Sequence, residues 1–313
     1  MQAHFNYCAR LYFSSEHFSF SMRARTLIFV LSLALGRGIA SAKAPPHDIN
    51  DPQTPAKELF GRAKDPAPMA ADPVGFYSRG CLAGSEALLP NGPHWQAMRP
   101  SRNRVWGHPN LIRFLERFSA SAAKASGWPG ILIGDMAQPR GGPMLTGHAS
   151  HQIGLDADIW LKPMPAQTLS RAEREAVSSN LVVRKDRLDI EPTAWTPAHL
   201  AVIRTAAQDD AVQRIFVNPA IKRAICRSAK GEPWLRKVRP EYGHDYHFHV
   251  RLFCPAGQSL CTEQDPTPEG DGCDASLEWW FTAEALHPVR KPPSPPLTLD
   301  QLPAECRRVL SAK

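Results

Sequence analysis

The 313-residue sequence predicts an α+β fold: a single domain with a small, mostly antiparallel central sheet, flanked by helices and long loops and tied by disulfide bonds. Three observations lead to this prediction. Short segments with strand periodicity alternate with segments of helical periodicity, and no internal repeat or second linker divides them. The 30 prolines favour long loops and extended segments. Seven cysteines, six of them after residue 42, favour disulfide bonds.

The expected elements follow the spacing of apolar residues. Helices are predicted over 110–125, 196–207 and 219–226, and strands over 130–135, 155–161, 214–217 and 247–252. Thr196 and Pro197 are a typical N-cap and N1 pair for the second helix. In the last strand, His247, His249 and Arg251 alternate with apolar residues and therefore share one face.

The first 42 residues have the pattern of an N-terminal extension followed by a secretory signal peptide. The basic segment Met22–Arg25 precedes the apolar run 27–35, and the small residues Ala40–Ala42 predict cleavage after Ala42. The apolar run is shorter than the roughly 18 residues that span a bilayer, so no transmembrane segment is expected in the mature protein. Cleavage would remove Cys8 and leave an even set of six cysteines. Such a set is typical of an exported protein with up to three disulfides, whose pairing is open among about 15 connectivities.

The two ends of the mature chain differ from its centre in composition. Residues 43–75 show no sustained period and predict a flexible lead-in, whereas residues 286–313 predict a stiff, proline-rich tail that Cys306 can attach to the body. The net charge of +7 includes cationic residues of the predicted signal peptide. The remaining mild positive charge suits an anionic partner but does not indicate nucleic acid.

Histidine and aspartate gather in two segments. They are His148, His151, Asp156 and Asp158 in the first segment and His244, His247 and His249 in the second. Imidazole nitrogen and carboxylate oxygen are the usual non-thiolate ligands of zinc, so the two segments together predict a metal site. One such histidine alone would more often be a surface or hydrogen-bonded residue, and the prediction therefore depends on the whole set.

Spacing restricts how the first segment can bind a metal. His151 and Asp158 are seven positions apart, which is about 23 Å along a strand or about 10 Å along a helix. Two ligands of one zinc lie only about 3–4 Å apart, so the chain must turn between them. Gly154 is the residue where such a turn costs least. We therefore expect His151 on a loop and Asp158 on the strand that follows it.

These segments resemble the penicillin-insensitive murein endopeptidase family, whose members are periplasmic zinc metallopeptidases that cut peptidoglycan cross-links. The resemblance is carried by Gly134–Met136, Gly147–Ile159, Arg214–Lys222, Trp234–Pro240 and the stretch from His244 to Pro255. It extends from about residue 80 to 273, with Cys306 also in register. It implies a zinc peptidase domain over 76–285.

The resemblance also implies a ligand set. In the wider group, zinc is bound through a His-x-x-x-x-x-x-Asp element and the second histidine of His-x-His, which here are His151, Asp158 and His249. His148 is a further metal-binding candidate. Three protein ligands leave a fourth position for water, as a catalytic zinc requires. The family's loop Asp-x-x-His reads Asp186-Arg187-Leu188-Asp189 here, so this loop is either a second cation site or a solvated charged loop.

The resemblance further implies roles for two histidines, a substrate and a disulfide pairing. His247 would act as the general base and His244 would line the site, orienting groups or stabilising an oxyanion. The substrate would be peptidoglycan peptide stems in the periplasm, cut between D-Ala and meso-diaminopimelate. The implied disulfides are Cys81–Cys306, Cys226–Cys273 and Cys254–Cys261. Two alternatives remain open: a D-Ala-D-Ala carboxypeptidase and a non-catalytic zinc-binding module.

Overall fold

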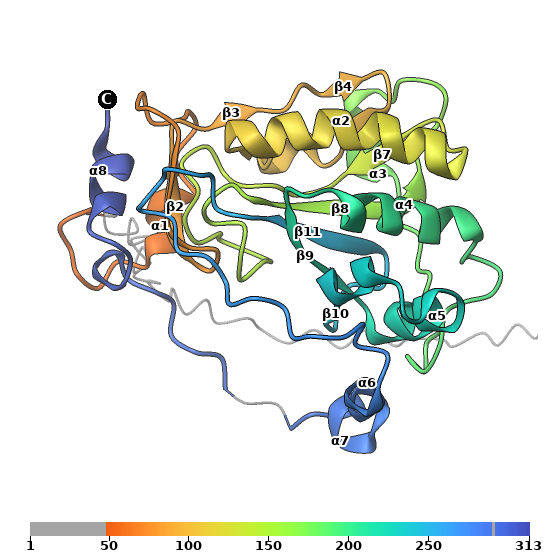
Figure 1. Cartoon of the computed structure of the whole chain (residues 1–313). Helices are drawn as coiled ribbons and strands as arrows, with labels where there is room; N and C mark the ends of the chain where they lie inside the picture. Colours follow the sequence, from red (N-terminus) through yellow and green to blue (C-terminus); the bar gives the residue numbers. More distant parts are fainter. Residues whose placement is uncertain (1–47, 290–291) are drawn as a thin grey trace, which may run out of the picture. The chain divides into compact units, whose positions relative to one another are not determined.

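A central sheet of seven strands organises the part of the chain that the computed structural model describes, residues 48–289 and 292–313 (Figure 1). In spatial order the strands are β10 (Val238–Pro240), β9 (Val212–Val217), β11 (His247–Leu252), β8 (Asp156–Pro163), β7 (Ile131–Ile133), β5 (Trp95–Ala97) and β4 (Asn91–Gly92). The pairs β10–β9 and β7–β5 are parallel and the other neighbours are antiparallel. The predicted α+β fold with a mostly antiparallel sheet is confirmed.

One face of this sheet is apolar and is covered by two helices, α2 (Pro109–Ser126) and α4 (Pro197–Gln208), which lie along it in Figure 1. Ala157 and Ile159 of β8 belong to the same buried cluster as residues of both helices. The ring of Phe118 on α2 meets that of Phe248 on β11 edge to face, with centroids 6.4 Å apart. Because side chains alternate along a strand, the polar residues of β8 and β11 must lie on the opposite face.

The predicted elements correspond closely to the observed ones. The expected helix over 110–125 is α2, that over 196–207 is α4 with Thr196 as its N-cap, and that over 219–226 is the start of α5 (Pro219–Ala229). The strand over 247–252 has the predicted bounds. Shorter helices, which the periodicity did not reveal, are α3 (Arg171–Ala176), α6 (Ala275–Glu278) and α7 (Ala283–Leu286).

A second, smaller core forms where the two ends of the described chain meet. It includes α1 (Ala56–Phe60), the hairpin of β1 (Asp72–Phe76) and β2 (Arg79–Ala83), and α8 (Glu305–Ser311). The sequence predicts residues 43–75 as flexible, whereas Ala56 and Phe60 are fully buried here. Their apolar side chains are stabilised by contact with a segment more than 200 residues away, which local periodicity does not reveal. The remaining strands, β3 (Glu86–Ala87) and β6 (Trp106–Gly107), form a two-stranded sheet.

Three disulfide bonds join Cys81 to Cys306, Cys226 to Cys273 and Cys254 to Cys261. This is the implied pairing, which is therefore confirmed. The first bond attaches α8 to β2, so the proline-rich tail ends in a helix that buries Cys306 and Val309 in the second core.

Within the described residues, no helix combines the length and the apolar character that crossing a membrane requires. The predicted N-terminal extension and signal peptide, residues 1–42, lie outside the described part of the chain.

Candidate metal centre

The carboxylate of Asp158 is the meeting point of the two histidine segments. Its Oδ1 lies 3.3 Å from His249 Nδ1, 3.4 Å from His151 Nε2 and 3.6 Å from His247 Nε2, and its Oδ2 lies 3.5 Å from His148 Nδ1. Asp158 is almost fully buried. The structure thus brings together four of the histidines that the sequence singles out.

Sheet register and a tight loop create this meeting point. Asp158 on β8 and His249 on β11 are direct partners in the antiparallel pair. His148 and His151 lie on the loop before β8, where Gly154 has a φ of +71° and His151 itself a φ of +66°. A non-glycine residue with left-handed φ is uncommon, and here the His151 N–H donates to Asp156 Oδ2 at 3.0 Å. The predicted turn at Gly154 is confirmed, but the strained backbone of His151 was not foreseen.

The distances around Asp158 fit a metal ion. Tetrahedral zinc with bonds of about 2.0–2.1 Å holds its ligand atoms about 3.3 Å apart. The two shortest contacts of Asp158 Oδ1 have this length. The same oxygen and both ring nitrogens of the fully buried His151 lack a hydrogen-bond partner among the described residues. Such unpartnered buried atoms are costly, and a shared cation would satisfy them.

His148, His151 and Asp158 place one ligand atom each within 4.8 Å of one another, and no other group of three does so in the described residues. This trio includes two of the three residues expected to bind zinc and the additional candidate His148. His249 is as close to the shared carboxylate as any of them, at 3.3 Å.

Asp156, on the same face of β8 as Asp158, contacts His249 and the backbone of His151. Its Oδ1 lies 3.2 Å from His249 Nε2, and both of its oxygens accept hydrogen bonds from the Arg251 guanidinium, at 2.9 and 3.1 Å. His249 thus turns the Nε2 edge of its ring toward Asp156 and the Nδ1 edge toward Asp158. Asp156 therefore orients His249 and, through the backbone, His151.

Asp135, two residues after the end of β7, performs the same task for His148. Its Oδ2 lies 2.9 Å from His148 Nε2 and also accepts from Arg104 at 2.8 Å and Arg102 at 2.9 Å. Burial acts to raise the pKa of Asp135, but the hydrogen bond from His148 and the two arginine charges lower it to about 2. Sequence reasoning did not assign a role to Asp135. Its position as the last residue of the strand predicted over 130–135 was the available signal.

Protonation at the centre follows from burial and from the two aspartates. Burial lowers the pKa of His151 to about 4 despite the adjacent Asp158, and it also lowers the pKa of His247. Both are therefore neutral at neutral pH, as a ligand or a base must be. Burial would lower the pKa of His249 as well, but Asp156 and Asp158 outweigh it and raise the pKa to about 9. The space between His249 and the carboxylates thus favours positive charge.

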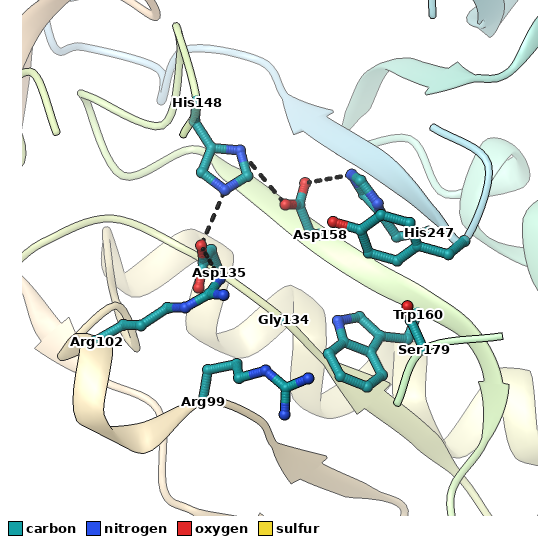
Figure 2. A pocket seen from close by; sticks show the side chains of 10 residues that line it. Arg99, Arg102, Gly134, Asp135, His148, Asp158, Trp160, Ser179 and His247 are labelled. Atoms are coloured by element: carbon teal, nitrogen blue, oxygen red, sulfur yellow. Dashed lines mark hydrogen bonds and ion pairs between the residues drawn. The ribbon is translucent and has the colours of Figure 1, made fainter. Parts of the chain in front are cut away.

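His247 and His244 border the centre on the side of β11. A pocket beside Asp158 is lined by His247, His148 and the residues Arg99, Arg102, Gly134, Asp135, Trp160, Ser179 and Tyr246 (Figure 2). His244 precedes β11, with its ring centroid 5.0 Å from that of His247, and its Nδ1 lies 3.0 Å from the Tyr242 carbonyl oxygen. Burial lowers the pKa of His244 to about 4, so the neutral ring donates from Nδ1 and keeps an accepting Nε2.

Asp186 and Asp189 lie on a separate loop. Neither belongs to the potential metal-binding group of His148, His151 and Asp158. Asp186 pairs with Arg184, and Asp189 accepts from Arg227 at 2.8 and 3.2 Å. Both carboxylates thus already have cationic partners within the chain.

The fold and this centre define a disulfide-bonded α+β protein with a buried histidine–aspartate cluster suited to a metal ion. The chain belongs to the penicillin-insensitive murein endopeptidase family, which it matches over residues 73–311. It is 46% identical to the penicillin-insensitive murein endopeptidase of Haemophilus influenzae over 243 residues, 77% of this chain and 83% of the relative. The enzymes of that name from Escherichia coli and Pectobacterium atrosepticum are 41% and 40% identical, over 78% and 86% of this chain and 88% and 94% of their own. The resemblance seen in the sequence is confirmed.

Proposed function

We propose that this protein is a periplasmic, zinc-dependent murein endopeptidase that hydrolyses the D-Ala–meso-diaminopimelate cross-links of peptidoglycan. The family to which the chain belongs, and the names of its relatives, support a peptidoglycan substrate. The zinc-dependent part of the proposal is supported by the surroundings of the buried Asp158 Oδ1. This oxygen has nitrogens of His249 and His151 at 3.3 and 3.4 Å.

In this proposal His151 Nε2, Asp158 Oδ1 and His249 Nδ1 hold the zinc, and His148 stands next to them as a further ligand. When bound, the ion supplies a Lewis acid that polarises the scissile carbonyl group and makes a water molecule more acidic. A second cation at Asp186 and Asp189 would have to displace Arg184 and Arg227, so we expect the first centre to be filled at lower metal concentration.

His247 is the proposed general base. Its Nε2 lies 3.6 Å from Asp158 Oδ1, which places it beside the ligands, and its lowered pKa keeps it neutral and able to accept a proton. It would take the proton of the attacking water and return it to the leaving amine. His244 would orient a donor group through its accepting Nε2. Stabilisation of an oxyanion by that nitrogen does not suit the neutral ring, because an oxyanion needs a donor.

Digestion of purified sacculi tests this function. Mature protein containing zinc should convert dimeric muropeptides into monomers, and chelation should abolish the reaction until zinc is restored. A His247→Ala variant should bind zinc but react about 100- to 10,000-fold more slowly. Trimming of pentapeptides without loss of dimers would contradict the endopeptidase assignment and indicate a carboxypeptidase. Undiminished activity of the His247→Ala variant would refute the assignment of the base.

A further inference from the structure

The pocket beside the metal centre has a cationic edge opposite the histidines. Figure 2 shows Arg99 and Arg102 on one side of it and His148, Asp158 and His247 on the other. Both arginines come from the segment after β5, which neither the histidine motifs nor the family's metal-binding pattern includes. They differ in how much of their hydrogen-bonding capacity is used within the chain.

Arg99 is largely committed to the fold. Its guanidinium donates to the carbonyl oxygens of Arg174, Glu175 and Val177 at the end of α3, and it lies over the ring of Trp160, 5.0 Å from the centroid. These contacts satisfy carbonyl groups that a helix end leaves without partners. Arg99 therefore adds positive charge to the pocket but has little capacity to bind a ligand directly.

The guanidinium of Arg102, in contrast, is available to bind a ligand. Its side chain is 49% exposed, and its only hydrogen bond to the described residues is the one from Nη1 to Asp135. Asp135 would keep two partners without Arg102, because the buried Arg104 and His148 bind the same oxygen at 2.8 and 2.9 Å. Most of the N–H donors of Arg102 thus remain free for an anion, and a guanidinium is well suited to a two-point contact with a carboxylate.

The backbone that carries Arg102 is held in place. Arg102 ends a short 3₁₀ turn, Pro100–Arg102, which lies between two residues of left-handed conformation, Arg99 and Asn103. The N–H and hydroxyl of Ser101 both donate to the Glu175 carboxylate, at 2.6 and 3.0 Å. A turn fixed in this way presents Arg102 with little loss of backbone entropy on binding.

We propose that Arg102 binds a free carboxylate on the residue that supplies the leaving amine, and so selects substrates with that group. This inference rests on the proposed function. In a D-Ala–diaminopimelate cross-link, the carbon attached to the scissile nitrogen carries a carboxylate that is not part of any peptide bond. Arg102 lines the same pocket as Asp158 and the proposed base His247, so a group on the carbon next to the scissile nitrogen would lie in the pocket that Arg102 borders. Arg102 is thus assigned as a specificity-determining residue for the reaction.

The test compares two synthetic cross-linked peptides that differ only in this group, a carboxylate in one and a primary amide in the other. Wild-type protein should prefer the carboxylate about 10- to 100-fold in kcat/KM, which is the range for a hydrogen bond to a charged group. Arg102→Gln should abolish the preference, because kcat/KM falls much more for the carboxylate substrate than for the amide substrate, chiefly through KM. The matched control is Arg113→Gln, an exposed arginine of α2, which should retain the wild-type preference.

Several outcomes would overturn the inference. Equal wild-type rates on both substrates would refute it while leaving the proposed function intact. An equal loss on both substrates in Arg102→Gln would show that Arg102 only supports Asp135. If wild-type protein cleaved neither peptide, the proposed function would fail. Calorimetry with the amine product of each peptide would then test the role of Arg102 separately. We expect the product with the carboxylate to bind about tenfold more tightly than the product with the amide, and we expect Arg102→Gln to remove this difference.

Discussion

Asp158 on β8 and His249 on β11 lie directly opposite each other in the sheet, and Asp158 Oδ1 is 3.3 Å from His249 Nδ1. Opposite residues of an antiparallel pair have their side chains on the same face, with Cβ atoms about 4.5–5.5 Å apart. The spacing of these two groups is therefore set by hydrogen-bonded strands rather than by a loop. The loop before β8 has only to bring His148 and His151 to a position that the sheet has already defined.

Replacing Asp158 by Asn should remove the metal. The variant loses the negative charge that four histidines surround, so we expect zinc affinity to fall by more than about 100-fold, beyond the usual effect of a supporting residue. Equilibrium dialysis with metal analysis measures this directly. Asp186→Asn, which changes an exposed carboxylate paired with Arg184, is the control and should bind zinc like the wild type. An equal loss in both variants would contradict the proposed ligands.

Asp156→Asn should weaken metal binding without removing a ligand. The amide keeps the size of the side chain but no longer carries the charge that orients His249, so we expect a 10- to 100-fold loss of zinc affinity. It also leaves the buried Arg251 without its counter-charge, which should cost about 3–5 kcal/mol of unfolding free energy. Dialysis and urea unfolding measure the two effects separately. Asp300→Asn, from the exposed pair with Arg307, should alter neither, and unchanged zinc affinity in Asp156→Asn would refute the orienting role.

The disulfide that closes the longest loop and the one that closes the shortest should contribute differently to the free energy of unfolding. Cys81 and Cys306 are separated by 225 positions and Cys254 and Cys261 by 7. The chain-entropy relation gives about 5 kcal/mol for the first bond and about 2 kcal/mol for the second. Paired Cys→Ala variants compared by urea unfolding provide the measurement. Loss of the first bond should also make α8 accessible to proteases. If the two variants lost the same unfolding free energy, loop length would not determine the contribution of these disulfides.

His108 should make stability depend on pH in the acidic range. It caps α2, with Nδ1 accepting from the Asn110 N–H at 3.1 Å, and burial, with a smaller effect of Arg113, lowers its pKa from 6.5 to about 4. The unfolded chain therefore takes up a proton at higher pH than the folded protein, so stability is lost as pH falls from 6.5 to about 4. The loss is at most about 3 kcal/mol.

The variant that isolates this effect is His108→Asn. Asn is a favoured N-cap residue but does not titrate, so the helix cap is preserved. The difference in unfolding free energy between wild type and variant, measured by urea titration, should change between pH 7 and pH 4 in favour of the variant. A pH-independent difference would show that His108 is not held in its neutral form.

Much of the local structure and the chemistry of the site can be predicted from the amino-acid sequence. Short-range sterics and burial produce the periodicities from which α2, α4 and β11 were predicted, and histidine–carboxylate spacing indicated a metal site with a turn at Gly154. The family resemblance added the disulfide pairing, which the structure confirms. The periodicities and the turn depend on neighbouring residues, and the family resemblance depends on motifs that are contiguous in the chain.

The groups that surround the centre become evident only in the folded chain. Asp135 meets His148, Arg251 meets Asp156, and Arg102 borders the pocket because strands and loops far apart in sequence are brought into register. The burial of Phe60 against a cluster that includes Cys306 has the same origin. Contacts of this kind depend on strand order and loop path, which the pattern of a single segment does not encode. The histidines indicated the chemistry, and the sheet together with the loop before β8 places them around one buried carboxylate.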